Sequence, residues 1–166
     1  LRDLGACQSP INAWITLLGI ETLALRMERH CENALKVAKY LESHPEVDWV
    51  SYAGLESSKY KDLCKRYMPK GAGGVFTFGL KGGYDAGVAL VESCELLSHL
   101  ANIGDTRSLI LHPASTTHRQ LTEEQLKAAG AGPEVIRISI GIETVEDVIN
   151  DLDHALSSLK TAQAAE

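Results

Sequence analysis

The stretch that decides the fold of this chain is Val135-Ile136-Arg137-Ile138-Ser139-Ile140-Gly141-Ile142. Successive side chains of a β-strand point to opposite faces of its sheet. The four isoleucines of the stretch therefore share one face, while Arg137, Ser139 and Gly141 share the other. This alternation predicts a strand with one hydrophobic face and one polar face.

Arg137 is the main candidate for a functional residue on the polar face. Its isoleucine neighbours hold it rigidly, and the planar guanidinium with its fork of donors suits bidentate binding of a carboxylate. Two other interpretations stay open from the residues alone. In the first, Arg137 lies on a solvent-facing strand surface, and in the second it pairs with a structural carboxylate.

A long helix is expected near the start of the chain. Ser9 and Pro10 form a helix start, because serine caps helix N-termini and proline suits the first turn. No further proline occurs before Ser43. One continuous helix over residues 10–43 would be about 50 Å long, which exceeds the diameter of a compact domain of this size. We therefore expect a kink near Gly19 and packing of the first half on something outside this chain.

The remaining patterns predict an α/β fold of α+β-like character, with about four strands in a mixed or antiparallel sheet and helices packed on one face. Residues 1–43 form a linking helix region, and residues 44–166 form a small α/β domain. The segment 109–119 contains Pro113 and many hydroxyl side chains and is expected to be a loop. The expected strands are 47–52, 75–80, 97–103 and 135–142, and the expected helices are 59–67, 84–94, 122–129 and 144–160.

The composition disfavours several classes of protein. The chain of 166 residues has a formal net charge of -6 and no cluster of lysine and arginine, which disfavours nucleic-acid binding. Its apolar runs are too short to span a bilayer, and its opening residues do not resemble a signal peptide. Its four cysteines form no CxxC pair, which argues against a zinc site or a disulfide framework. We expect a cytoplasmic protein with reduced thiols.

Other motifs give weaker indications. The glycine-rich run 71–74 precedes a strand, whereas a phosphate-binding loop follows one, so we interpret it as a turn. The three histidines between residues 99 and 118 lack the spacing or the carboxylate partners of a metal site, and no metal is expected. In the loop 102–108, Gly104 permits an unusual backbone angle, and exposed amides there suit an anion. An ordinary turn is the alternative interpretation of that loop.

The sequence shows little catalytic chemistry of its own. It contains no nucleophile elbow, no glycine-rich cofactor fingerprint after a strand and no lysine in an obvious Schiff-base setting. Together with the overlong helix, this leads us to expect that the chain is an incomplete part of a larger protein. No catalytic or cofactor-binding residue is expected within it.

Four stretches, which cover nearly the whole chain, carry a resemblance to a known family. The stretches are residues 9–30, 69–74, 101–118 and 136–143. The third contains Asn-Ile-Gly-Asp followed by His-Pro-Ala-Ser-Thr-Thr-His, and the fourth reads Ile-Arg-Ile-Ser-Ile-Gly-Ile-Glu. In these motifs and their order, the chain resembles the Cys/Met-metabolism group of pyridoxal-phosphate enzymes, and within it the C-terminal third of the O-acetylhomoserine sulfhydrylase branch.

The resemblance implies the small C-terminal domain of a fold-type-I pyridoxal-phosphate enzyme. The lysine that holds the cofactor would then lie upstream of Leu1, in a large domain whose edge includes the first part of residues 1–43. Arg137 matches the arginine of the family's Arg-x-Ser-x-Gly motif, which binds the substrate α-carboxylate. Asn102 stands in a loop that also helps to hold that carboxylate. Many relatives have serine there, so the backbone of Asn102 is the expected contact. Thr117 matches a threonine near the same site.

The implied activity is a γ-replacement, in which acetate leaves Cγ of O-acetyl-L-homoserine and sulfide adds to give homocysteine. The resemblance implies pyridoxal 5′-phosphate in a homotetrameric full-length enzyme, but this chain alone is not expected to bind the cofactor. Two alternatives stay open. One is a cystathionine γ-synthase or lyase relative with another nucleophile or leaving group. The other is a non-catalytic α/β module for ligand binding or oligomerisation.

Overall fold

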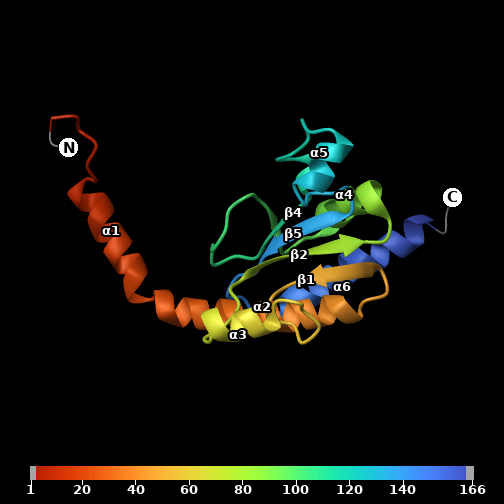
Figure 1. Ribbon diagram of the computed structural model, residues 1–166, viewed down its shortest axis with the longest axis horizontal. Coiled ribbons are helices and arrows are strands. Elements are labelled where there is room, and N and C mark those ends of the chain that lie inside the picture. The colour runs from red at the N-terminus through yellow and green to blue at the C-terminus, as the bar shows by residue number, and fades with distance from the viewer. Residues whose placement is uncertain (1–2, 164–166) are drawn as a thin grey trace.

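A five-stranded sheet forms the centre of the computed structural model, which describes residues 3–163 (Figure 1). The strand order is β1-β2-β5-β4-β3, and every neighbouring pair is antiparallel except β3 and β4. The strands are β1 (Val47–Ser51), β2 (Val75–Leu80), β3 (Ser98–His99), β4 (Leu109–Leu111) and β5 (Val135–Ser139). Residues 135–139 of the predicted strand 135–142 thus form the middle strand, with β2 on one side and β4 on the other, and the strand ends three residues earlier than expected.

Three helices, α2 (Leu23–Ser43), α4 (Gly83–Ser93) and α6 (Val145–Gln163), pack on one face of this sheet (Figure 1). Beneath them the isoleucines of β5 are fully buried beside the phenylalanines of β2, in the cross-strand pairs Phe76–Ile138 and Phe78–Ile136. The predicted fold class, a mixed sheet with helices on one face, is therefore confirmed.

The sheet has five strands where about four were expected, because β4 lies in the segment 109–119 that was expected to be a loop. All three residues of β4 are buried, and the strand pairs with both β3 and β5. It is too short to show a period of two before Pro113 breaks it. The expected strand 97–103 shrinks to β3, since the chain leaves the sheet after His99.

The expected long helix is broken into α1 (Pro10–Glu21) and α2 at Thr22, close to the predicted kink at Gly19. The Arg26 guanidinium donates to the Gly19 carbonyl across the break, at 2.6 Å. From His30 onward α2 contributes buried residues to the core, whereas α1 contributes none. The apolar side chains of α1 and the start of α2 stand exposed, among them Trp14, Leu17 and Leu25.

Three short helical segments complete the described part of the chain: α3 (Lys61–Tyr67), the 3-10 turn η1 (Pro113–Ser115) and α5 (Glu123–Ala128). The expected capping box at Thr122 and Gln125 is present at the start of α5. None of the helices in residues 3–163 is long and apolar enough to cross a membrane.

The packing of α6 on the sheet gives a first prediction. Leu152 is fully buried on α6, so Leu152→Ala leaves a cavity and lowers the free energy of unfolding by about 2–5 kcal/mol. Leu63→Ala is the matched control, because Leu63 on α3 is 51% exposed, and it changes stability by about 0.5 kcal/mol or less. Urea denaturation of the two variants tests this, and equal losses would contradict the assigned packing.

Candidate functional site

A loop over residues 100–108 runs beside the polar face of β5. The Arg137 guanidinium donates to the Ala101 carbonyl at 2.5 Å, and the Gly104 N–H donates to the Ser139 hydroxyl at 3.3 Å. Further along, the Ile142 N–H donates to a carbonyl of the same loop at 2.9 Å. The loop is therefore held against β5 and the residues that follow it at several successive points.

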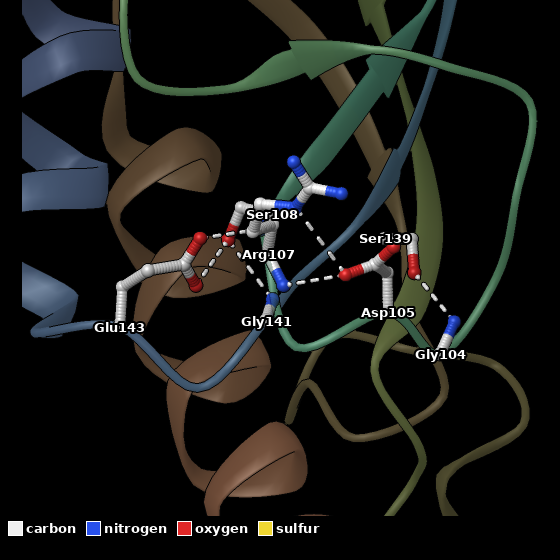
Figure 2. A network of polar contacts seen from close by, with 7 residues as sticks. All are labelled: Gly104, Asp105, Arg107, Ser108, Ser139, Gly141 and Glu143. Carbon is white, nitrogen blue, oxygen red and sulfur yellow. Dashed lines mark hydrogen bonds and ion pairs between the residues drawn. The ribbon is translucent and has the colours of Figure 1, made fainter.

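The far end of the loop is fixed by Glu143, which follows β5 (Figure 2). One oxygen of the Glu143 carboxylate accepts the Ser108 N–H at 2.5 Å, and the other accepts the Ser108 hydroxyl at 3.0 Å. The Ser108 hydroxyl oxygen accepts the Gly141 N–H at 2.9 Å. Ser108 is completely buried, so these bonds satisfy polar groups that water does not reach.

Gly141 has no room for a side chain at this junction. A Cβ built there would lie less than 3.0 Å from the Glu143 carboxylate and from the Thr106 carbonyl. The backbone of the loop thus approaches the end of β5 as closely as glycine allows.

The guanidinium of Arg137 keeps most of its donors free. It has five N–H donors, and its single hydrogen bond within residues 3–163 goes to the Ala101 carbonyl. None of the carboxylates in that part of the chain pairs with it. The interpretation as half of a structural ion pair is therefore not supported, and the partly exposed guanidinium can receive an anion.

The nearest acidic residue of the loop is already engaged. Asp105 accepts the Arg107 N–H at 3.1 Å, and its carboxylate lies 3.6 Å from the Arg107 guanidinium (Figure 2). This backbone N–H, with the charge of the same arginine, holds the pKa of Asp105 below its usual value. The Asp105 carboxylate is thus paired with Arg107, and it does not serve as a partner of Arg137.

Helix α2 supports the site from behind. The His30 ring donates through Nδ1 to the Ile140 carbonyl at 2.6 Å, and the Asn33 amide donates to the carbonyls of Gly141 and Glu143 at 3.2 and 2.9 Å. Both side chains are buried. The segment that follows β5 is therefore fixed by α2 on one side and by the loop on the other.

The other two predicted site residues are placed differently. Asn102 is exposed and makes no hydrogen bond within the described part of the chain, while the carbonyl of its neighbour Ala101 contacts Arg137. Thr117 is exposed on the turn after η1, and its hydroxyl lies 2.8 Å from Nδ1 of His118. The structure thus brings the backbone beside Asn102 to Arg137 and shows no contact of Thr117 with either residue.

His112 lies under the same region and has a structural role. Its Nε2 donates to the Pro133 carbonyl at 2.8 Å, and its Nδ1 lies 2.9 Å from the Ser115 hydroxyl, which also donates to the His112 carbonyl. Burial lowers the pKa of His112, in spite of the opposing effect of the Pro133 carbonyl, and the charge of His99 adds to the lowering.

Comparisons with known proteins bear directly on this arrangement. A sequence model of the family described as Cys/Met metabolism PLP-dependent enzyme matches residues 1–157. The chain belongs to the Cys/Met-metabolism family of PLP-dependent enzymes. Among curated members of this family that it resembles, O-acetyl-L-homoserine sulfhydrylase 1 of Thermus thermophilus is 50% identical over 95% of this chain and 37% of the relative. The homocysteine synthase of Schizosaccharomyces pombe is 49% identical over 94% of this chain and 36% of the relative.

A solved structure agrees with the family. The putative O-acetylhomoserine (thiol)-lyase of Campylobacter jejuni, crystallised with N′-pyridoxyl-lysine-5′-monophosphate, is 46% identical and superposes with a TM-score of 0.86. The match covers 94% of this chain and 37% of that chain. The chain therefore spans little more than a third of the length of these relatives.

The lysines of this chain do not fit the cofactor of the family. A lysine that forms a Schiff base needs a desolvated setting or a neighbouring cation to lower its pKa. Every described lysine side chain except Lys61 is exposed. Burial and the neighbouring Lys65 lower the pKa of Lys61, but its side chain pairs with the exposed Glu56 and is not free to form a Schiff base.

Ser108, Glu143 and Asn33 were not predicted to have roles in the site. The spacing of two that links Arg137 and Ser139 continues through Gly141 to Glu143, and this signal points to Glu143. Asn33 is a polar residue at helical spacing within the apolar stripe of α2, a pattern that indicates a buried hydrogen bond. Ser108 shows no comparable signal in the sequence.

The buried neutral ring of His112 predicts acid sensitivity. The folded-state pKa lies below the ordinary value of 6.5, so the unfolded chain binds more protons as the pH falls, and stability is lost from about pH 6.5 downward. His112→Gln lowers the free energy of unfolding at pH 7.5. Between pH 7.5 and 5.5, however, this variant loses less of its free energy of unfolding than the unmodified chain does. Urea titrations at both values measure this difference, with exposed His154→Gln as the control. An identical acid loss in His112→Gln and the unmodified chain would refute the assignment.

Proposed function

We propose that this chain forms the part of a PLP-dependent O-acetylhomoserine sulfhydrylase that holds the substrate carboxylate. The full-length enzyme would make homocysteine from O-acetyl-L-homoserine and sulfide. The observation that carries the proposal is Arg137, fixed on the central strand with free donors and no carboxylate partner in residues 3–163. The names of the sulfhydrylase relatives support the choice of substrate over a cystathionine synthase or lyase.

Arg137 acts by positioning the amino acid. Two parallel N–H donors of the guanidinium bind the two oxygens of the α-carboxylate, which fixes the orientation of the substrate as well as its place. The Ala101 carbonyl holds Nη2 and so limits rotation of the guanidinium. A fixed carboxylate in turn places Cα and Cγ of the substrate relative to the groups that act on them.

Asn102 and Thr117 complete the proposed carboxylate site. The backbone at Asn102 lies next to the carbonyl that Arg137 contacts, which suits a main-chain N–H as a further donor to the anion. Thr117 would add a hydroxyl donor once the substrate is bound. Its hydroxyl lies next to Nδ1 of His118, and a hydroxyl that accepts from that ring nitrogen can still donate to an anion.

The rest of the full-length enzyme would supply the cofactor and the lysine that holds it. In this proposal residues 1–43 link the two parts, residues 44–166 form the small domain, and the enzyme is a cytoplasmic homotetramer. The exposed apolar side chains of α1 support a role in contact with another part of the protein.

The role of Arg137 is tested in the full-length enzyme. Arg137→Ala removes a charged bidentate contact, which costs about 2–5 kcal/mol of transition-state stabilisation. The value of kcat/KM for O-acetyl-L-homoserine therefore falls roughly thirtyfold or more. The KM for sulfide stays near its normal value. Arg137→Lys keeps the charge without the fork and recovers part of the loss.

Arg66→Ala is the control for this measurement, because exposed Arg66 lies over the Tyr67 ring on α3. Absorbance of the bound cofactor reports that each variant is intact. A normal KM for O-acetyl-L-homoserine in Arg137→Ala would refute the assignment.

The expected backbone contact at Asn102 gives a separate prediction. Asn102→Ala changes the KM for O-acetyl-L-homoserine by about threefold or less, since the exposed side chain makes no hydrogen bond in the described residues. Steady-state kinetics of this variant beside Thr117→Val separate the two residues. A loss in Asn102→Ala as large as that in Arg137→Ala would show that the side chain itself binds the carboxylate.

A further inference from the structure

The loop over residues 100–108 has one common anchor at its base. The Ser108 carbonyl accepts the Ser98 N–H of β3 at 3.0 Å, so the residues that enter and leave the loop are joined there. The Ser108 N–H and hydroxyl both face Glu143. Every hydrogen-bonding group of Ser108 is thus engaged, and the geometry at the base of the loop depends on Glu143.

Glu143 directs its charge entirely toward this anchor. Both of its carboxylate oxygens are used by Ser108, and within residues 3–163 it pairs with no cation. Hydrogen bonds to an ionised acceptor are stronger than those between neutral groups. Holding a carboxylate in a partly buried place without a cation costs desolvation free energy. This cost indicates that the position of Ser108 matters.

The same positions along the strand connect the anchor to Arg137. Positions 137 and 139 of β5 contact the loop at Ala101 and Gly104, and positions 141 and 143, which follow the strand, both contact it at Ser108. Residues 101–104 are exposed and are held mainly by these contacts. Ala101 and Ser108 lie at the two ends of this series of contacts, so the position of Ser108 helps to set where the loop, with the Ala101 carbonyl that orients the guanidinium, lies against β5.

We propose that Glu143, acting through Ser108, is a positioning residue for the carboxylate site. It fixes the loop so that the Ala101 carbonyl holds the Arg137 guanidinium in the orientation that receives an α-carboxylate. The inference rests on the proposed function, because it takes Arg137 as the carboxylate-binding group. It adds a residue that does not touch the substrate but sets the preference for an acid over an uncharged analogue.

The test compares an acid with its amide in the full-length enzyme. L-Homoserine and L-homoserinamide, which differ only in the carboxylate, are used as competitive inhibitors of the reaction. Glu143→Ala raises the inhibition constant of L-homoserine about tenfold or more, because the guanidinium loses its orientation. The constant for L-homoserinamide stays within about twofold, since the amide does not use the charged fork. Ser108→Ala gives the same selective loss.

Two further variants separate positioning from folding. Glu143→Gln keeps an oxygen for the Ser108 N–H and restores the preference for the acid to within about threefold of the unmodified enzyme. Glu146→Ala removes an acidic side chain from the first turn of α6, which weakens the helix without touching Ser108. Glu146→Ala leaves the preference for the acid unchanged. If Glu143→Ala fails to fold, the positioning role is decided by Ser108→Ala, which is expected to lose the preference, compared with Glu143→Gln, which is expected to keep it.

The outcomes distinguish this inference from the proposed function. If Arg137→Ala abolishes the preference for the acid while Glu143→Ala and Ser108→Ala keep it, the positioning role is refuted and the proposed function stands. If Arg137→Ala itself keeps the preference, the proposed function fails. An equal weakening of acid and amide in Glu143→Ala would show a purely structural role and would also overturn the inference.

Discussion

The burial of Ile136, Ile138 and Ile140 beneath three helices is the constraint on which the rest of this structure depends. Each fully buried isoleucine contributes about 1.5–3 kcal/mol relative to exposure. A slip of the strand by one residue would turn these side chains outward and drive Arg137 into the core, where an unpaired charge is very unfavourable. Hydrophobic burial on one face thus fixes the position of the guanidinium on the other.

This coupling joins stability to function within a single strand. The loop makes little core of its own, and its position comes from contacts with β5 and with the residues that follow it. Those residues are held in turn by His30 and Asn33 of α2. A change in the packing of α2 is therefore transmitted to the proposed carboxylate site through the backbone of residues 140–143, without altering any group that is proposed to contact a substrate.

The sequence predicted the parts of this arrangement that depend on local periodicity. The alternation in β5, the start of α1 at Ser9 and the capping box of α5 all follow from residues near one another in the chain. The strand β4 was not predicted, because three residues shortly before a proline are too few to show the alternation of a strand. The bonds between Ser108 and Glu143 join residues 35 positions apart, and only the folded register of β4 against β5 brings such groups together.

The unpaired state of Arg137 is the feature that links the fold to its proposed chemistry. Arg137 lies partly exposed on a central strand, and the loop beside it contains a carboxylate in Asp105. That carboxylate is instead engaged by Arg107, and Glu143 is engaged by Ser108. Neither carboxylate pairs with Arg137 in residues 3–163. In the proposed function an anionic ligand supplies the counter-charge, and an α-carboxylate matches the geometry of the fork.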